Sequence, residues 1–102
     1  MTKKNNMDDL KKVRKDIDNI DNKIIELIGD RFKEIHKVTK LKESKDEIID
    51  HERITHILKS VQSKAKRNKI DPEIIVRIWQ IFIQEAITVS YTHLTLPTIY
   101  SV

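Results

Sequence analysis

The sequence predicts an all-α protein with three helices per chain, the first of them very long. Two observations support this prediction. From residue 8 to about residue 44 the chain has no proline and one glycine, and apolar residues recur there at alternating steps of three and four, the spacing of one helix face. Two later segments, which begin near residues 50 and 71, repeat this pattern and are separated by a polar turn. Three helices then account for almost all of the chain before residue 89.

The composition fits one small helical domain and excludes several classes of protein. Of the 102 residues, 38% are hydrophobic and 35% are charged, which indicates neither a disordered chain nor a membrane protein. No apolar run approaches the ~20 residues of a membrane span, and no signal peptide is expected behind the lysine-rich start. The absence of cysteine excludes disulfides and thiolate sites and fits a cytoplasmic location. Charges of both signs are interleaved, so we expect no nucleic-acid partner.

The first helix is predicted to begin with Asn6 as its N-cap and with Asp8 and Asp9 in its first turn, where the helix dipole favours acids. Residues 1–6 are expected to be disordered. A helix of about 37 residues is about 55 Å long, whereas a compact domain of this size is about 35 Å across. The far half of the helix therefore needs cover from another chain, which predicts a homodimer.

One face of this helix carries an apolar seam that ends in a cation. The seam consists of Leu10, Val13, Ile17, Ile20, Ile24 and Leu27. Arg31 occupies the next position in the same register, and a charge at a core-facing position is costly unless it is paired with an anion. Lys42 follows roughly 16 Å further along this face, while Arg14 points roughly 100° away from Arg31. The pattern predicts a site for a small anion.

The second and third helices are predicted from their caps and apolar stripes. Asp50 is the expected N-cap of the second helix, which ends in the polar turn at residues 66–69. Asp71 and Pro72 are the expected N-cap and first residue of the third helix, which extends to about Thr88. The third helix is apolar on nearly every side, as expected of a helix buried between partners.

Four groups of residues combine into a more specific pattern. They are Leu10-x-x-x-Arg14-x-x-Ile17-x-x-x-Asp21, the segment Ile25-Glu26-Leu27-Ile28-Gly29-Asp30-Arg31, Lys42, and Asp50-His51-Glu52-Arg53. Their order and spacing resemble the all-helical, type II chorismate mutases, over roughly residues 7–88, which we take as the domain. The resemblance implies an intertwined three-helix homodimer with two active sites, which rearranges chorismate to prephenate in aromatic amino-acid biosynthesis.

The reaction implied by the resemblance needs no nucleophile, cofactor or metal, because chorismate rearranges within one molecule. The site has to hold the substrate in its reactive conformer and stabilise charge on the ether oxygen. The resemblance assigns one substrate carboxylate to Arg31, the other to Arg14 of the partner subunit, and the ether oxygen to Lys42. The other expected substrate contacts are Val38, Asp50, Arg53, Ile54 and Ala86, with Asp50 and Arg53 at the mouth of the site.

Three positions depart from the family pattern. Many members have an acid or amide at the position of Ile54, which binds the ring hydroxyl of the substrate, and often a serine at that of Ala86. The isochorismate pyruvate lyases of siderophore synthesis share the fold and have an apolar residue at the position of Ile54, so lyase activity is an alternative. At position 90 the family typically places glutamine or glutamate over the ether oxygen, whereas this chain has Ser90.

From Val89 the sequence changes character. Residues 89–98 read Val-Ser-Tyr-Thr-His-Leu-Thr-Leu-Pro-Thr, which is the translation, in one reading frame, of a transposase-type sequencing-library adapter. We interpret residues 89–102 as translated adapter rather than native sequence, and we expect the natural gene to continue past Thr88. A natural threonine-rich tail is the alternative.

A non-catalytic helical dimerisation or nucleic-acid-binding module is the alternative of another class. A long cationic amphipathic helix is more often a solvated coiled-coil face than an active site. The seam position of Arg31 argues against this alternative, as does the joint spacing of Arg31 and Lys42 with Arg14, Asp50 and Arg53. The sequence near His51 and His56 lacks the pattern of further ligands that a metal site needs, so we expect both histidines to be solvated.

Overall fold

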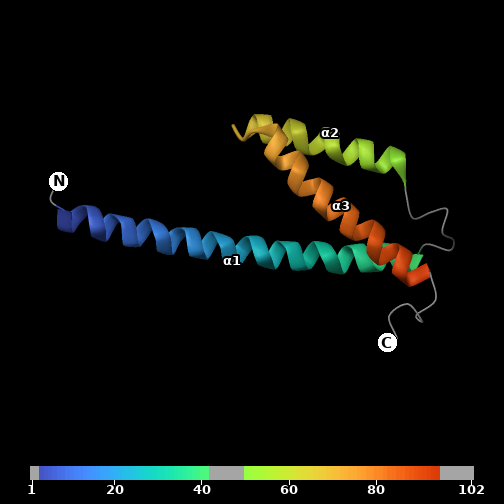
Figure 1. The fold of residues 1–102 in the computed structure, drawn as a ribbon, viewed down its shortest axis with the longest axis horizontal. Helices are drawn as coiled ribbons and strands as arrows, with labels where there is room; N and C mark the ends of the chain where they lie inside the picture. The colour runs from blue at the N-terminus through green and yellow to red at the C-terminus, as the bar shows by residue number, and fades with distance from the viewer. Residues whose placement is uncertain (1–2, 42–49, 95–102) are drawn as a thin grey trace. The chain divides into compact units, whose positions relative to one another are not determined.

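The computed structural model describes residues 3–41 and 50–94, and these ranges contain three α-helices and no strand (Figure 1). The helices are α1 (Lys3–Leu41), α2 (His51–Arg67) and α3 (Pro72–Leu94). The all-α prediction is therefore confirmed. The chain divides into two compact units, Met1–Glu34 and Ile35–Val102, each of which is described by itself. The first unit holds most of α1, and the second holds its last two turns together with α2 and α3.

The long helix α1 contains 39 residues, which corresponds to about 58 Å. It begins at Lys3, so the predicted N-cap at Asn6 is wrong, and Asp8 lies beyond the first turn. The preceding residues contain neither proline nor glycine, and lysine and asparagine reduce helix stability by only tenths of a kcal/mol, so nothing stops the helix at residue 6. The helix thus includes part of the segment that was expected to be disordered, and Lys42–Ile49 lie outside the described residues.

The first unit exposes the apolar seam of α1. Leu10, Val13, Ile17, Ile20 and Ile24 are 47–54% exposed, and Leu27 is 66% exposed. Ile28 and Arg31 are half-buried, whereas most other residues of this unit are exposed. A regular stripe of exposed apolar side chains on one helix face is a surface that another element normally covers. None of the described helices is long and apolar enough to cross a membrane.

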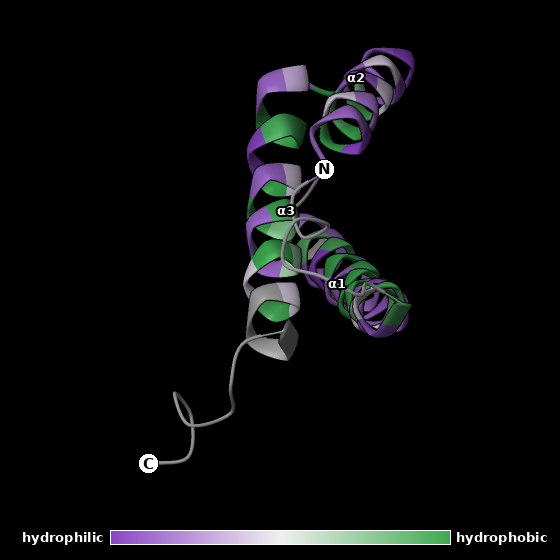
Figure 2. Ribbon diagram, turned by 90° about the vertical axis from the view of Figure 1, so that its right-hand side faces the viewer, coloured by the Kyte–Doolittle hydropathy of each residue, from purple (hydrophilic) through white to green (hydrophobic). Residues whose placement is uncertain are grey.

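In the second unit, α2 and α3 form a helical hairpin (Figure 1). Both predicted N-caps are confirmed. The Asp50 carboxylate accepts a hydrogen bond from the Arg53 amide at 2.9 Å, and that of Asp71 accepts one from the Glu73 amide at 2.9 Å. Hydrophobic residues recur along most of α3, with hydrophilic residues between them (Figure 2). Among the described apolar residues only Val61 and Ala65 are buried, so the core of a single chain is thin.

The end of α3 differs from the prediction. The helix continues to Leu94 rather than stopping near Thr88. Residues 89–94 contain no glycine or proline, and the β-branched and polar residues there weaken a helix without breaking it. The continued helix does not bear on whether residues 89–102 are native, which stays a prediction.

The turn between α2 and α3 places a lysine in the left-handed region. Lys69 has a φ of 58° and follows the C-cap Asn68. The Ile70 amide donates to the Ala65 carbonyl at 2.9 Å, and the Lys69 amide donates to the Lys66 carbonyl at 3.1 Å. This pair of bonds is the Schellman motif, in which glycine is the preferred residue at the left-handed position.

We expect Lys69→Gly to raise the free energy of unfolding by about 1 kcal/mol, because glycine adopts the left-handed conformation without strain. Lys69→Ala is the matched control, since it removes the same charged side chain but keeps Cβ, and it should leave stability nearly unchanged. Urea unfolding at one fixed protein concentration measures both variants. If Lys69→Gly were no more stable than Lys69→Ala, the strain assigned to this turn would be absent.

Candidate functional site

Two of the predicted site residues lie on α1 in the first unit. Arg14 is exposed, whereas Arg31 is half-buried and its Nη1 atom is buried. Seventeen residues separate them on one continuous helix, which corresponds to about 25 Å along the axis and about 100° around it. A small dicarboxylate cannot reach both guanidinium groups of the same chain. If both cations bind one molecule, they come from different chains.

Four of the other predicted contacts lie in the second unit with well-defined surroundings. Asp50 and Arg53 are exposed at the start of α2, and Ile54 and Ala86 are half-buried. The cap at the start of α2 uses the backbone amide of Arg53, so the Arg53 guanidinium takes no part in it. The carboxylate of Asp50 is held at the first turn of α2, as predicted, and a guanidinium such as that of Arg53 is of the type that binds carboxylates.

The last turns of α1 are joined to α3 by a hydrogen bond that the sequence did not predict. Thr39 Oγ1 and Ser90 Oγ lie 3.0 Å apart, and both residues are buried. Val38, which is 47% exposed, immediately precedes Thr39, and Ala86 lies one turn before Ser90 on α3. Two predicted substrate contacts therefore neighbour the two ends of this bond. Lys42 lies outside the described residues.

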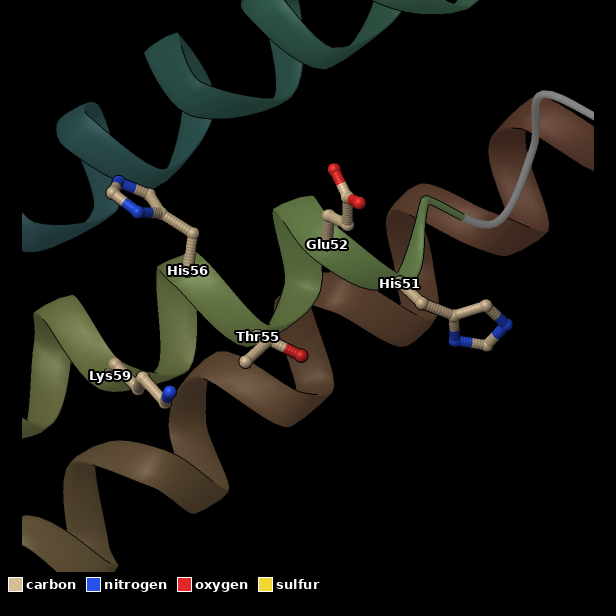
Figure 3. Close-up of a pocket in the computed structure, with 5 residues that line it drawn as sticks. All are labelled: His51, Glu52, Thr55, His56 and Lys59. Carbon is tan, nitrogen blue, oxygen red and sulfur yellow. The ribbon is translucent and has the colours of Figure 1, made fainter.

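A surface depression on α2 does not coincide with the predicted site. It is lined by His51, Glu52, Thr55, His56 and Lys59. Figure 3 shows these side chains pointing in different directions, with the two histidines far from facing each other. Both histidines are exposed, as expected, and no group of three or more His, Cys, Asp or Glu side chains in the described ranges could hold a metal ion. The depression is an open polar surface rather than a converging site.

The chemistry of the predicted set is that of an anion clamp. Arg14 and Arg31 carry planar guanidinium groups that bind carboxylates through two parallel hydrogen bonds. Asp50 is the one acid in the set, and its carboxylate already accepts a backbone amide. The set pairs no nucleophile with a base, so it suits binding and charge stabilisation rather than covalent chemistry.

Comparisons with known proteins identify similar sequences. The family model described as chorismate mutase type II matches residues 13–91. A chorismate mutase from Methanocaldococcus jannaschii is 36% identical over 76 residues, which cover 74% of this chain and 77% of that protein. No solved structure gives a significant match. The matched residues include every predicted site residue, and the match to the family model extends three residues beyond Thr88.

We expect Asp50→Ala to lower the free energy of unfolding by about 1 kcal/mol, because the Arg53 amide loses its acceptor at the start of α2. Asp50→Asn is the matched control, since its amide oxygen can still accept that bond while the charge is lost. Urea unfolding of the two variants distinguishes the contribution of the capping hydrogen bond to stability from that of the negative charge. Equal destabilisation by alanine and asparagine would contradict the capping role.

Proposed function

The chain belongs to the type II chorismate mutase family, and we propose that it rearranges chorismate to prephenate in a site to which two copies of the chain contribute. The activity is that of an isomerase. The observation that carries the shared site is the placement of Arg14 and Arg31 about 25 Å apart on one helix, with Arg31 in register with an exposed apolar seam. A cytoplasmic location stays a prediction.

The same seam supports a homodimer. Its members are about half exposed or more in the single chain, and a second copy of α1 offers an equally long apolar face. An isologous dimer buries the same patch on both copies. In the register that the family resemblance implies, such a dimer would bring Arg14 of the partner subunit to the site at Arg31, which no single chain can do. Dimerisation and site assembly are then one event.

In the proposed mechanism the cations act on a substrate that reacts within itself. Arg31 binds one carboxylate of chorismate, and Arg14 of the partner subunit binds the other, which holds the substrate in its folded, reactive conformer. Lys42 donates to the ether oxygen, where negative charge develops as the carbon–oxygen bond breaks. No proton is transferred and no covalent intermediate forms. The interactions with Lys42 are strongest in the transition state, so Lys42 contributes to kcat.

The remaining contacts shape the site around the ring. Asp50 and Arg53 at the start of α2 line its mouth, and Val38 packs against the substrate. Ile54 and Ala86 leave the ring hydroxyl with fewer polar partners than in most family members, since neither side chain can form a hydrogen bond. This feature favours isochorismate pyruvate lyase activity as the second candidate, because isochorismate carries its hydroxyl elsewhere on the ring.

Position 90 bears on the catalytic power of this chain. If residues 89–102 are translated adapter, Ser90 replaces a glutamine or glutamate whose longer side chain would reach the ether oxygen. Ser90 instead forms a hydrogen bond with Thr39. We therefore propose that the chain as it stands is a weaker catalyst than one carrying the natural sequence past Thr88.

We expect Arg14→Ala and Arg31→Ala, each made alone, to lower kcat/KM at least about 100-fold, as the loss of an electrostatic contact does. Refolding the two variants together should restore activity to roughly a quarter of the unsubstituted level, because half of the dimers are mixed and each mixed dimer has one site with both arginines. The measurement is the initial rate of chorismate loss.

The matched control for this experiment is a mixture of Arg31→Ala and Lys42→Ala. These two residues serve the site from the same chain, so no mixed dimer regains a complete site and activity should not return. Absence of recovery in the mixture of Arg14→Ala and Arg31→Ala, or a folded monomer in sedimentation equilibrium at micromolar concentration, would contradict the shared site.

We expect Ile54→Glu to shift the substrate preference toward chorismate by about tenfold in kcat/KM, because a regained hydrogen bond to a buried hydroxyl is worth about 1–3 kcal/mol. Ile54→Leu, which stays apolar at nearly constant volume, is the control and should keep the original ratio. Formation of prephenate from chorismate and of pyruvate from isochorismate gives the two rates. An unchanged ratio in Ile54→Glu would remove Ile54 from the specificity site.

A further inference from the structure

Positive and negative charges are separated along α1. Residues 1–15 carry six cations and two acids, whereas residues 16–30, which we call the acidic stretch, carry five acids and one lysine. The acids are Asp16, Asp18, Asp21, Glu26 and Asp30, and all five are exposed. Acids one helical turn apart repel each other. The acidic stretch is therefore unfavourable for α1 alone and would be stabilised by a cationic neighbour.

The second helix, α2, carries cations over an equal length. Residues 53–67, which we call the basic stretch, contain five cations and no acid, and each stretch is about 21 Å long. The cations are Arg53, Lys59, Lys64, Lys66 and Arg67, and all five are exposed. Cations in the last turn of a helix interact favourably with its dipole, which accounts for the last three but not for Arg53 and Lys59. The basic stretch thus has more positive charge than its own helix requires.

The proposed shared site would bring the acidic stretches of two copies together. Arg31 of one chain and Arg14 of the partner subunit form one site, and the symmetry of the dimer repeats this pair as a second site. The two α1 helices then run antiparallel, with the residues between positions 14 and 31 of both copies lying between the two sites. Two copies of the acidic stretch carry ten acids and two lysines. Such a dimer needs cations from another element to offset their repulsion.

We propose that the basic stretch of α2 lies beside the acidic stretch of the partner subunit and that this contact selects how two copies associate. The inference rests on the proposed function, which places Arg53 and Arg14 of the partner subunit in one site. If α2 runs parallel to the partner's α1 from that site, it meets the acidic stretch. If it runs antiparallel, it meets residues 1–13, whose net charge is positive. Charge complementarity therefore favours the parallel arrangement, and it contributes to specificity more than to affinity.

Charge reversal within the two stretches tests the contact. The acid-reversed variant combines Asp18→Lys with Asp21→Lys, and the base-reversed variant combines Lys64→Glu with Arg67→Glu. All four positions lie within about 40° of the arginine that their own helix gives to the site. Each variant alone brings like charges together at both contacts of a homodimer. We therefore expect its dimer dissociation constant, measured by sedimentation equilibrium, to rise at least about tenfold.

Mixing the two variants should restore the association. In a mixed dimer the new lysines on α1 of one chain face the new glutamates on α2 of the other, and the unaltered acids and cations face each other at the second contact. Native mass spectrometry of an equimolar mixture should therefore detect mostly mixed dimers, whereas random association gives half. Raising NaCl from about 0.05 M to about 1 M should weaken the mixed dimer and strengthen each homodimer, because salt screens attraction and repulsion alike.

The matched control combines Lys11→Glu with Lys12→Glu. It changes the net charge by as much as the base-reversed variant does, at two exposed positions of α1 that precede the acidic stretch. Both lie about 100° or more from the centre of the apolar seam. The control should dimerise as the unsubstituted chain does. A loss of dimer equal to that of the base-reversed variant would show that net charge, rather than the proposed contact, governs association.

The outcomes separate this contact from the proposed function. If each reversed variant formed homodimers as tight as the mixed dimer, the contact would be overturned, while prephenate formation by the unsubstituted chain would still support the proposed function. If the reversed variants failed to fold even when mixed, Asp18→Asn with Asp21→Asn would decide, because an unchanged salt dependence of its dimer would also overturn the contact. A monomeric unsubstituted chain would contradict both the contact and the shared site, and its activity would still test the proposed reaction.

Discussion

The apolar seam of α1 is about half exposed in the single chain. The stability of the folded molecule therefore depends on the free energy that covering this seam would release. Full burial of a leucine, isoleucine or valine side chain stabilises by about 1.5–3 kcal/mol, so each half-exposed seam residue leaves roughly 1 kcal/mol unrealised. Six such residues leave roughly 6 kcal/mol, which is comparable with the whole stability of a small domain. Val61 and Ala65, the buried apolar residues of the part of the chain that the structure describes, cannot supply that amount. The proposed association of two chains through α1 would recover it.

Under the proposed dimer, the position of Arg31 in the seam has an energetic consequence. A partner that covers the seam also removes water from the neighbourhood of Arg31, whose Nη1 atom is buried already in the single chain. A guanidinium in such a place is costly unless an anion accompanies it. Under the proposed function a substrate carboxylate binds Arg31 in a site made by two chains, so binding and dimer stability are linked, and chorismate should stabilise the folded dimer by mass action.

The sequence predicts those parts of the fold that depend on local chemistry. The caps at Asp50 and Asp71 follow from one side chain and the amides two or three residues later, so they could be read directly. The ends near Asn6 and Thr88 were predicted less well, because a change in composition is not a stop signal and the helices continue where no glycine or proline interrupts them. Helix existence was therefore predicted better than helix length.

The features of the candidate site also differ in how well the sequence predicts them. Arg14 and Arg31 could be placed from helix periodicity, because both lie on one element and their separation is fixed by the rise per residue. The hydrogen bond between Thr39 and Ser90 could not be predicted, because it joins two common residues from different helices. Neither residue lies in a sequence pattern that indicates such a bond. Ser90 departs from the family pattern, but nothing in the sequence identifies Thr39 as its hydrogen-bond partner.

Under the proposed function, the distribution of retained and altered positions among the helices has a physical consequence. The cations Arg14, Arg31 and Lys42 all lie in the first 42 residues, whereas the altered positions Ile54 and Ala86 lie on α2 and α3. Carboxylate binding and stabilisation of the ether oxygen depend on charge, which acts over several ångströms and tolerates small changes of shape. Recognition of the ring hydroxyl depends on a hydrogen bond, which a single apolar residue removes. Under the proposed function, the chain thus keeps in its first 42 residues the charges that accelerate the rearrangement, whereas apolar residues on α2 and α3 occupy positions that would distinguish one hydroxylated ring from another.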